Sequence, residues 1–183
     1  MGYDCSVRGE DVPPSPKPDY DCKEPWGGEE YAAWNQQYYF RRNIWGGSRL
    51  ADALIDMGMG FDARSYGVKW PDWPSAEEYR VERREWEDEA GEWHSEWQGE
   101  RAQEFIAAND AVLDWHGPEI PGIPVHKICY SNDGWHVTKE EAHSALLIYR
   151  KAIEAGKTHP DIFFDDFIPF LESAARHDGF ETW

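Results

Sequence analysis

Two short segments combine residue types that can bind small anions or nucleotides. The first, residues 129–138, contains a predicted tight turn just before a helix that starts at Thr138. It carries four polar or aromatic side chains: Asn132, Asp133, Trp135 and His136. A helix N-terminus offers free N–H groups to an anion. The same pattern also fits a plain turn, with Gly134 at positive φ and Trp135 packed on the helix start.

The second segment places arginine and tryptophan around the pair Gly46-Gly47. Its four members are Arg41, Arg42, Trp45 and Arg49. Arginine beside an aromatic ring at a helix start can hold a phosphate or a nucleotide. Arginines in the last turn of a helix also offset the helix dipole without any ligand. Both interpretations stay open at this point.

Residues 75–104 are mainly acidic. They contain eleven carboxylates and four arginines, a net charge of 4 − 11 = −7. We expect them to form a partner surface that includes Glu85, Asp88, Glu89, Glu92 and Glu96. As one helix this segment would span about 45 Å, with one net charge per ~6 Å against one phosphate per ~1.7 Å of duplex DNA. The charge density of such a helix alone is too low to mimic DNA. A solvated helix face with ion pairs explains the same residues.

No motif in the sequence indicates a catalytic site. The histidines are scattered, and neither His-Glu-x-x-His nor paired Cys-x-x-Cys occurs, so no metal site is predicted. A glycine-rich phosphate loop and a Gly-x-Ser-x-Gly elbow do not occur either. The sequence therefore predicts no catalytic residue and no cofactor, and it favours a binding protein over an enzyme.

Charge and cysteine usage restrict the partners and the compartment. The 183 residues include 36 acidic and 18 basic side chains, a formal charge of −18, which repels nucleic acid and anionic membranes and favours a basic protein partner. No apolar run approaches the ~18 residues of a membrane span. Three scattered cysteines fit a reducing compartment. We expect a soluble cytoplasmic protein, and nothing in the sequence indicates its oligomeric state.

In the first half of the chain, the pattern predicts one strand and two helices. Residues 2–8 alternate in character, as a half-buried strand does, and residues 9–27 form a proline-rich surface loop. An aromatic stripe predicts a helix from Glu29 to about Trp45, with Gly46-Gly47 as its stop. A second helix follows from Ser48 to Gly58, and then an ordered loop over 59–74.

In the second half, two capping boxes mark helix starts. Ser75 to Glu78 begins a helical pattern that reaches about Trp115, as one helix or as two with a break near Gly99. Residues 125–130 are predicted to be extended. Thr138 to Glu141 begins a helix that ends before Gly156. A last helix begins near Asp165 or Asp166, and Phe180 to Trp183 form a closing strand.

These elements predict an α+β fold that is mainly α. Five to six helices accompany a minimal sheet formed by the N-terminal and C-terminal strands. We expect a single domain over residues 1–183. Because the chain has 11 tryptophans, its core is predicted to be rich in indole rings.

Several segments in the same order resemble one family of proteins. They are Met1-Gly2-Tyr3-Asp4 with Val7-Arg8, residues 39–46, Gly122-Ile123-Pro124 with His126-Lys127, residues 131–138, and Ala174-Ala175-Arg176-His177 with Gly179-Phe180. The chain thus resembles an uncharacterised family of small acidic proteins from actinobacteria and their phages. That family has no assigned activity. The resemblance implies a bacterial or phage cytoplasmic setting and assigns no catalytic residue.

The sequence thus favours a non-enzymatic acidic binding protein, such as a phage-encoded inhibitor or modulator, that engages a basic protein partner. The alternative is a small-molecule or nucleotide-binding protein, or a hydrolase, that uses a pocket of Trp, Arg, His and Asn side chains.

Overall fold

The computed structural model describes residues 2–72, 75, 77, 83–113, 115, 120–129 and 135–183. It confirms the α+β class, with six α-helices in the described residues and a small sheet that contains both terminal strands. By its contacts the chain divides into two compact units: Met1–Tyr66 with Gly117–Trp183, and Gly67–His116. Two compact units need not be two domains, so the single domain stays a prediction.

The sheet of the first unit joins the two ends of the chain. Its order is β2-β1-β8-β7, and every neighbouring pair is antiparallel. The strands are β1 (Gly2–Val7), β2 (Tyr39–Asn43), β7 (Trp135–Val137) and β8 (Phe180–Thr182). Alternation along β1 buries Tyr3, Cys5 and Val7, so the predicted strand and its pairing with the C-terminal strand are confirmed.

The first predicted helix is shorter than its aromatic stripe suggested. Helix α1 (Gly28–Tyr38) stops where Tyr39 enters β2, so the predicted continuation to Trp45 is wrong. Five residue pairs with β1 hold β2 extended, and this register buries Phe40. Tertiary pairing outweighs the helical periodicity here. The proline-rich segment before α1 is irregular, as predicted, apart from one isolated bridge between Asp19 and Gly27.

Helix α2 (Ile44–Met57) contains the two glycines that were predicted to end the preceding helix. Asn43 caps α2, because its side-chain oxygen accepts a hydrogen bond from the N–H of Gly46 at 2.7 Å. A Cβ on Gly47 would lie 2.4 Å from the ring of Tyr3. Gly47 therefore permits the close approach of α2 to β1. The predicted end at Gly58, with φ of 77°, is confirmed.

The first unit also contains a short pair of parallel strands. Strands β3 (Gly60–Phe61) and β6 (Ile123–Pro124) pair, and β6 leads into the helical turn α5 (His126–Cys129). The predicted extended stretch over 125–130 is therefore wrong for residues 126–129. All four side chains of α5 are buried, and that burial favours the compact turn. A 3-10 turn, η1 (Ala63–Tyr66), follows β3.

Two helices near the C-terminus form as predicted. The capping box of α6 (Lys139–Glu154) is complete: Thr138 accepts from the N–H of Glu141, and Glu141 accepts from the N–H of Thr138. After the 3-10 turn η2 (Asp161–Phe163), α7 (Phe167–Arg176) carries Pro169 in its first turn.

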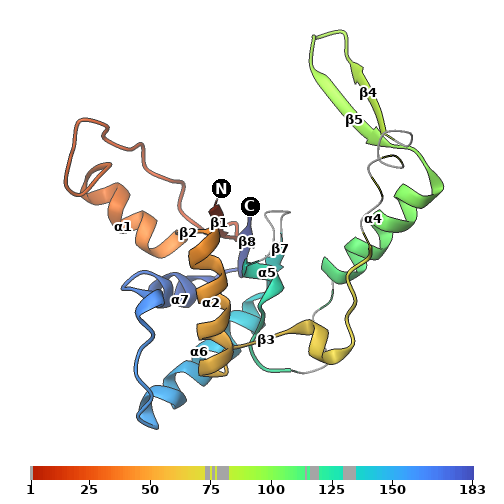
Figure 1. Cartoon of the computed structure of the whole chain (residues 1–183). Helices are drawn as coiled ribbons and strands as arrows, with labels where there is room; N and C mark the ends of the chain where they lie inside the picture. The colour runs from red at the N-terminus through yellow and green to blue at the C-terminus, as the bar shows by residue number, and fades with distance from the viewer. Residues whose placement is uncertain are drawn as a thin grey trace. The chain divides into compact units, whose positions relative to one another are not determined.

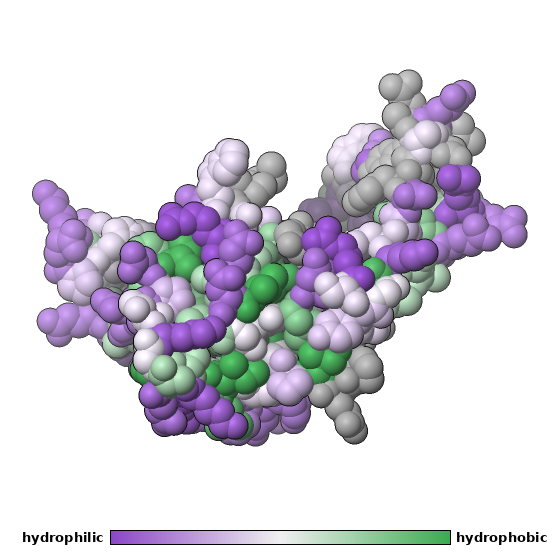
Figure 2. Space-filling view, turned by 60° about the horizontal axis from the view of Figure 1, so that its bottom comes forward, coloured by the Kyte–Doolittle hydropathy of each residue, from purple (hydrophilic) through white to green (hydrophobic). Residues whose placement is uncertain are grey.

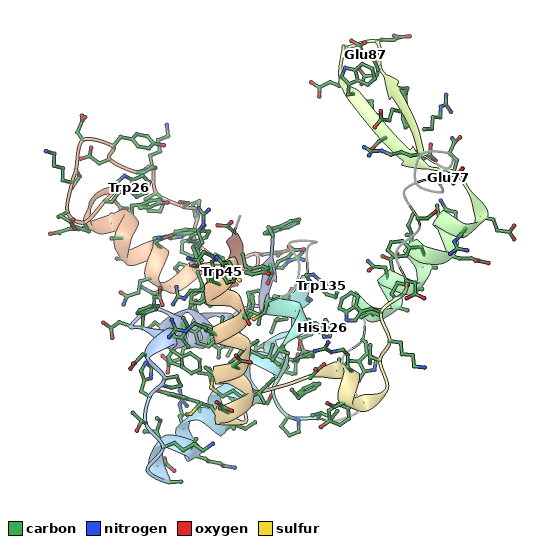
Figure 3. The ribbon with its side chains drawn as sticks, in the orientation of Figure 1. Trp26, Trp45, Glu77, Glu87, His126 and Trp135 are labelled. Atoms are coloured by element: carbon green, nitrogen blue, oxygen red, sulfur yellow. The ribbon has the colours of Figure 1, made fainter. Side chains whose placement is uncertain are left out.

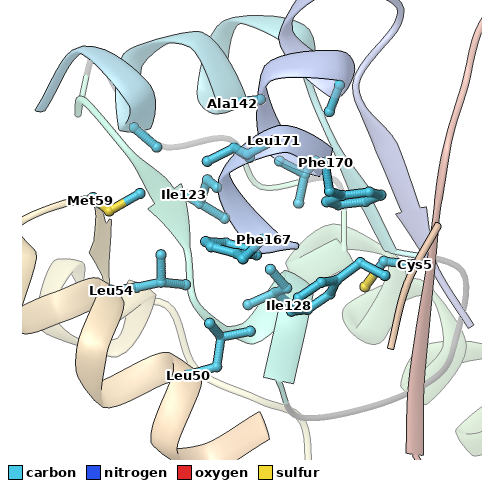
Figure 4. Packing of buried hydrophobic residues seen from close by; sticks show 14 of the residues in the cluster. Cys5, Leu50, Leu54, Met59, Ile123, Ile128, Ala142, Phe167, Phe170 and Leu171 are labelled. Carbon is cyan, nitrogen blue, oxygen red and sulfur yellow. The ribbon is translucent and has the colours of Figure 1, made fainter. Parts of the chain in front are cut away.

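The core of the first unit is phenylalanine-rich and aliphatic (Figure 4). Phe40 lies with its ring centroid 5.0 Å from that of Phe167 and 5.5 Å from that of Phe170. Around them pack Leu50, Leu54, Ile123, Ile128 and Leu171. Among the described residues, Trp135 is the one tryptophan in the set of largest fully buried side chains, so the expected indole-rich core is wrong for this part of the chain. On the face drawn in Figure 2, hydrophilic residues form most of the outline.

The second unit overturns the prediction of helix throughout residues 75–115. Strands β4 (Arg83–Glu87) and β5 (Trp93–Trp97) form an antiparallel hairpin, and only then does helix α4 (Glu100–Leu113) begin (Figure 1). The spacing of seven between Trp86 and Trp93 suits one helix stripe, yet Asp88 and Gly91 close a turn between them. The capping box falls partly outside the described residues, because Glu78 is not among them.

Candidate binding surfaces

The acidic hairpin, residues 83–97, carries all five acidic residues that the sequence assigned to a partner surface. Two arginines and six carboxylates give it a net charge of 2 − 6 = −4. All five predicted acidic residues are exposed. A five-residue strand is about 17 Å long, so the hairpin carries one net charge per ~4 Å, still fewer than the phosphates of duplex DNA. DNA mimicry by the hairpin alone stays disfavoured.

The two faces of the hairpin differ in chemistry. Residues that are directly opposite in an antiparallel pair share a face. Trp93 is opposite Glu87, and Ser95 is opposite Glu85. This face exposes an indole ring beside carboxylates, because 72% of Trp93 is accessible to solvent. In Figure 3 Glu87 lies near the end of the hairpin that carries the turn.

The other face is organised by stacked rings. The rings of Trp86 and His94 stack with centroids 5.4 Å apart, and the guanidinium of Arg84 lies 5.4 Å from the Trp86 ring. Cross-strand ring pairs and cation–π contacts each stabilise such a hairpin by about 1 kcal/mol or less. The hairpin is therefore ordered by its own surface contacts.

Asp88 organises the turn between the strands. Its Oδ1 accepts the N–H groups of Ala90 and Glu92, each at 2.9 Å, and its Oδ2 lies 2.7 Å from Nε2 of His94. The hydrogen bond with His94 and the backbone donors lower the pKa of Asp88 below its usual value. One of the predicted partner-binding carboxylates thus also has a structural role.

A second surface, here called the β2 groove, lies in the first unit. It has a volume of about 580 Å³ and is lined by Trp26, Asn35, Gln36, Arg41, Phe164 and Asp165, among others. Asn35 and Gln36 lie on α1 and Arg41 on β2, while Phe164 and Asp165 precede α7. The volume falls within the range of small-molecule sites.

The structure separates the four members of the predicted arginine and tryptophan group. Arg42 is nearly buried, and its guanidinium pairs with Asp166 at 2.7 Å and 3.2 Å. Arg41, the preceding residue on the same strand, lines the β2 groove. Trp45 and Arg49 are exposed on α2 and do not line this groove. Since Arg41 and Arg42 lie in a strand, the helix-dipole explanation of these two arginines is wrong.

The predicted turn segment is only partly described, because Asn132 and Asp133 lie outside the described residues. Trp135 is buried, with its ring centroid 5.1 Å from that of His126 (Figure 3). His136 occupies the next position on β7, and its Nε2 lies 2.9 Å from the carbonyl oxygen of Asp178. Trp135 therefore packs inside the protein, whereas His136 contacts the backbone just before the neighbouring strand β8.

A buried ion pair beside this segment was missed by the sequence reasoning. The Nζ atom of Lys127 donates to both carboxylate oxygens of Glu141 at 2.8 Å and 3.0 Å, and no part of the Lys127 side chain is exposed. The Thr138 capping box predicted the local role of Glu141. No motif or spacing in the sequence indicated that Glu141 would pair with Lys127. A lysine that belongs to no apolar stripe and no motif is normally predicted to be exposed to solvent.

The buried thiols are poor nucleophiles. Burial raises the pKa of Cys5 to about 12 and raises that of Cys129 well above its usual value. A thiolate mechanism at either cysteine is therefore disfavoured at neutral pH. Within the described part of the chain, no group of three or more His, Cys, Asp and Glu side chains is arranged to hold a metal ion.

Comparison of the chain with protein-family models, curated proteins and solved structures finds no match. The resemblance to the actinobacterial and phage family stays a prediction. None of the described helices is both long and apolar enough to cross a membrane.

Proposed function

We propose that this chain is a non-enzymatic binding protein that engages a basic protein partner through the acidic hairpin. One observation supports this most: the five carboxylates expected from the sequence lie on an exposed two-stranded hairpin that also presents Trp93. Carboxylates steer a basic partner and fix its register, while an exposed aromatic ring supplies contact area. Charge alone would attract many basic proteins, and the indole ring adds selectivity.

The edges of the hairpin supply a second means of recognition. Strands β4 and β5 pair with each other and with no other described strand. An outer strand edge presents N–H and C=O groups to an incoming chain, and charged side chains limit which chains add there. We propose that the acidic side chains select a basic segment at this edge.

The setting of the proposal is the cytoplasm of a bacterium or a phage-infected cell. The three cysteines are free thiols, which supports a reducing compartment. A protein of this kind blocks or modulates its basic partner by occupying the surface that the partner uses elsewhere.

A charge-matched capture experiment tests the proposal. The variant Glu85→Gln/Glu89→Gln/Glu92→Gln removes three hairpin charges, and Glu29→Gln/Glu30→Gln/Glu154→Gln removes three exposed charges from α1 and α6. Immobilised wild-type protein and the α1/α6 variant should capture the same basic protein from a low-salt bacterial lysate, and the hairpin variant should not. Equal capture by both variants, or no capture by the wild type, would refute the proposal.

A further inference from the structure

The arginines in and next to the β2 groove are already paired. Arg42 does not line the groove, but it is bound through two hydrogen bonds to Asp166, which does. Nε of Arg41 lies 3.6 Å from Oδ1 of Asp4, which also accepts a hydrogen bond from the hydroxyl of Tyr39. An anionic ligand would therefore compete with carboxylates that these cations already hold. The groove does not favour the phosphate of a nucleotide.

Two acceptor groups of the groove have no partner among the described residues. Oδ1 of Asn35 is buried and has no hydrogen-bond partner among the described residues. The carboxylate of Asp165 makes no ion pair with any described side chain, although its backbone carbonyl accepts from Gln36 at 3.5 Å. A buried acceptor without a partner is rare and needs an explanation. A ligand that donates hydrogen bonds would satisfy Asn35.

Two aromatic rings in the groove are exposed. The exposed fraction is 56% for Trp26 and 59% for Phe164. Phe164 has φ of 47°, the one positive φ of a non-glycine residue within the described ranges. Such a conformation is strained and persists only where its surroundings hold it. Nε2 of His159 lies 3.1 Å from the carbonyl oxygen of Phe164, and Nδ1 of His159 lies 2.7 Å from the hydroxyl of Tyr149.

Arg42 shows what these groups can bind. Its guanidinium carbon lies 4.1 Å from the centroid of the Phe40 ring and 4.8 Å from that of Phe164, while Asp166 binds its nitrogens. A guanidinium suits this environment because it is planar, stacks on rings and donates two parallel hydrogen bonds to a carboxylate. Trp26, Phe164 and Asp165 also line the groove and supply the same kinds of group, aromatic rings and a carboxylate.

We propose that the β2 groove binds a guanidinium group, with Asp165 as its counter-ion, Asn35 as a further acceptor, and the rings of Trp26 and Phe164 as its walls. The group belongs either to a small molecule or to an arginine side chain of a protein. This site lies in the first unit and is independent of the acidic hairpin.

Calorimetric titration with N-acetyl-arginine amide tests the proposal, because this probe carries a guanidinium as its single charge. N-acetyl-citrulline amide has nearly the same shape without the charge and serves as the ligand control. The wild-type protein should bind the arginine probe and not the citrulline probe. If neither probe binds, or both bind equally, the proposal is wrong.

Single substitutions test which residues of the β2 groove bind the arginine probe. Asp165→Asn and Trp26→Ala should each weaken binding by about tenfold, as expected for loss of a charge-assisted hydrogen bond or of a stacked ring. Glu154→Gln removes an equal charge from the exposed end of α6 and should leave the affinity unchanged. Equal affinity of Asp165→Asn and wild type would overturn the assignment. The triple hairpin variant should bind the arginine probe normally, which separates this site from the proposed partner surface.

Phe164→Gly tests the strained position separately. Glycine adopts positive φ readily, so this variant should keep or raise the melting temperature while it weakens binding of the arginine probe. Tighter or unchanged binding would contradict the role of the ring. Finally, acetyl-Gly-Arg-Gly-amide distinguishes the two possible sources of the guanidinium group. If it binds more tightly than N-acetyl-arginine amide, the group belongs to an arginine of a polypeptide. If it binds more weakly, the group belongs to a free small molecule.

Discussion

The four-stranded sheet and the acidic hairpin hold their strands together by different means. In the sheet, alternate residues of β1, β7 and β8 enter a core that also takes in α2, α6 and α7. In the hairpin, β4 has exposed residues on both faces apart from the partly covered Trp86, and a turn centred on Asp88 fixes the register. Isolated two-stranded hairpins are marginally stable in water.

This difference separates structural roles from binding roles. In the sheet, the apolar side chains of β1, β7 and β8 contribute to folding, because alternate residues of these strands are buried. The hairpin places Trp93 and the five carboxylates in solvent, where all of them except the turn residue Asp88 contribute little to stability. Substitutions in the sheet should therefore affect stability, and substitutions in the hairpin should affect binding.

The largest expected effect is in the core beneath the sheet. Phe170→Ala should lower the free energy of unfolding by about 3–5 kcal/mol, because it leaves a cavity beside Phe40 and Phe180. Chemical denaturation followed by circular dichroism measures this loss. Trp93→Ala in the hairpin is the matched control and should cost about 0.5 kcal/mol or less. Similar losses in the two variants would remove the contrast between the regions.

The next effect concerns the ion pair between Lys127 and Glu141. Lys127→Met should cost about 3–5 kcal/mol, since it leaves the Glu141 carboxylate buried without its counter-ion. The double variant Lys127→Met/Glu141→Gln should lose less, because the amide can still accept from the N–H of Thr138. The free energies of unfolding of both variants decide the matter. A double variant as unstable as the single one would show that packing of the lysine, and not its charge, matters here.

A smaller and local effect is expected at the hairpin turn. Asp88→Ala removes the acceptor of the Ala90 and Glu92 N–H groups and should speed hydrogen exchange at these two amides. Asp88→Asn keeps an oxygen acceptor and should preserve most of the protection. Amides of β1 should exchange as in the wild type. Faster exchange in β1 as well would mean that the hairpin and the sheet unfold together.

The smallest effect is that of pH on the same turn. Because the pKa of Asp88 is lowered in the folded protein, its contribution is complete above its unfolded pKa of about 3.9 and is lost as pH falls through the folded value. Exchange at Ala90 and Glu92, corrected for intrinsic rates, should therefore be constant from about pH 5 upward and rise in acid. In the Asp88→Asn variant the acid-dependent rise should disappear. If it persists there, another group is responsible.

Local signals in the sequence located much of the fold. Period-two alternation predicted β1, the Thr138 capping box predicted the start of α6, and Gly58 predicted the end of α2. Each of these depends on contacts within a few residues of the signal. The pairing of the two terminal strands was also predicted, because two short strands at the two ends of a mainly helical chain have few other partners.

Signals that depend on distant partners were missed. Tyr39 to Asn43 continue a helical stripe, and only the pairing with β1 makes them a strand. Residues 83–97 have tryptophans at helical spacing, yet the Asp88 turn brings Trp86 opposite His94. The proposed guanidinium site could not be predicted either, because Asp165 is far along the chain from Trp26 and Asn35. Nothing local to Phe164 signals its positive φ.

We propose that hairpin charge, and not overall acidity, selects a basic partner. The most direct test measures the affinity for the captured protein as a function of salt, in the wild type and in the two charge-matched triple variants. We expect a steep fall of affinity with rising salt for the wild type and the α1/α6 variant, and weak, nearly salt-independent binding for the hairpin variant. Identical salt dependence in all three proteins would show that the hairpin carboxylates do not select the partner.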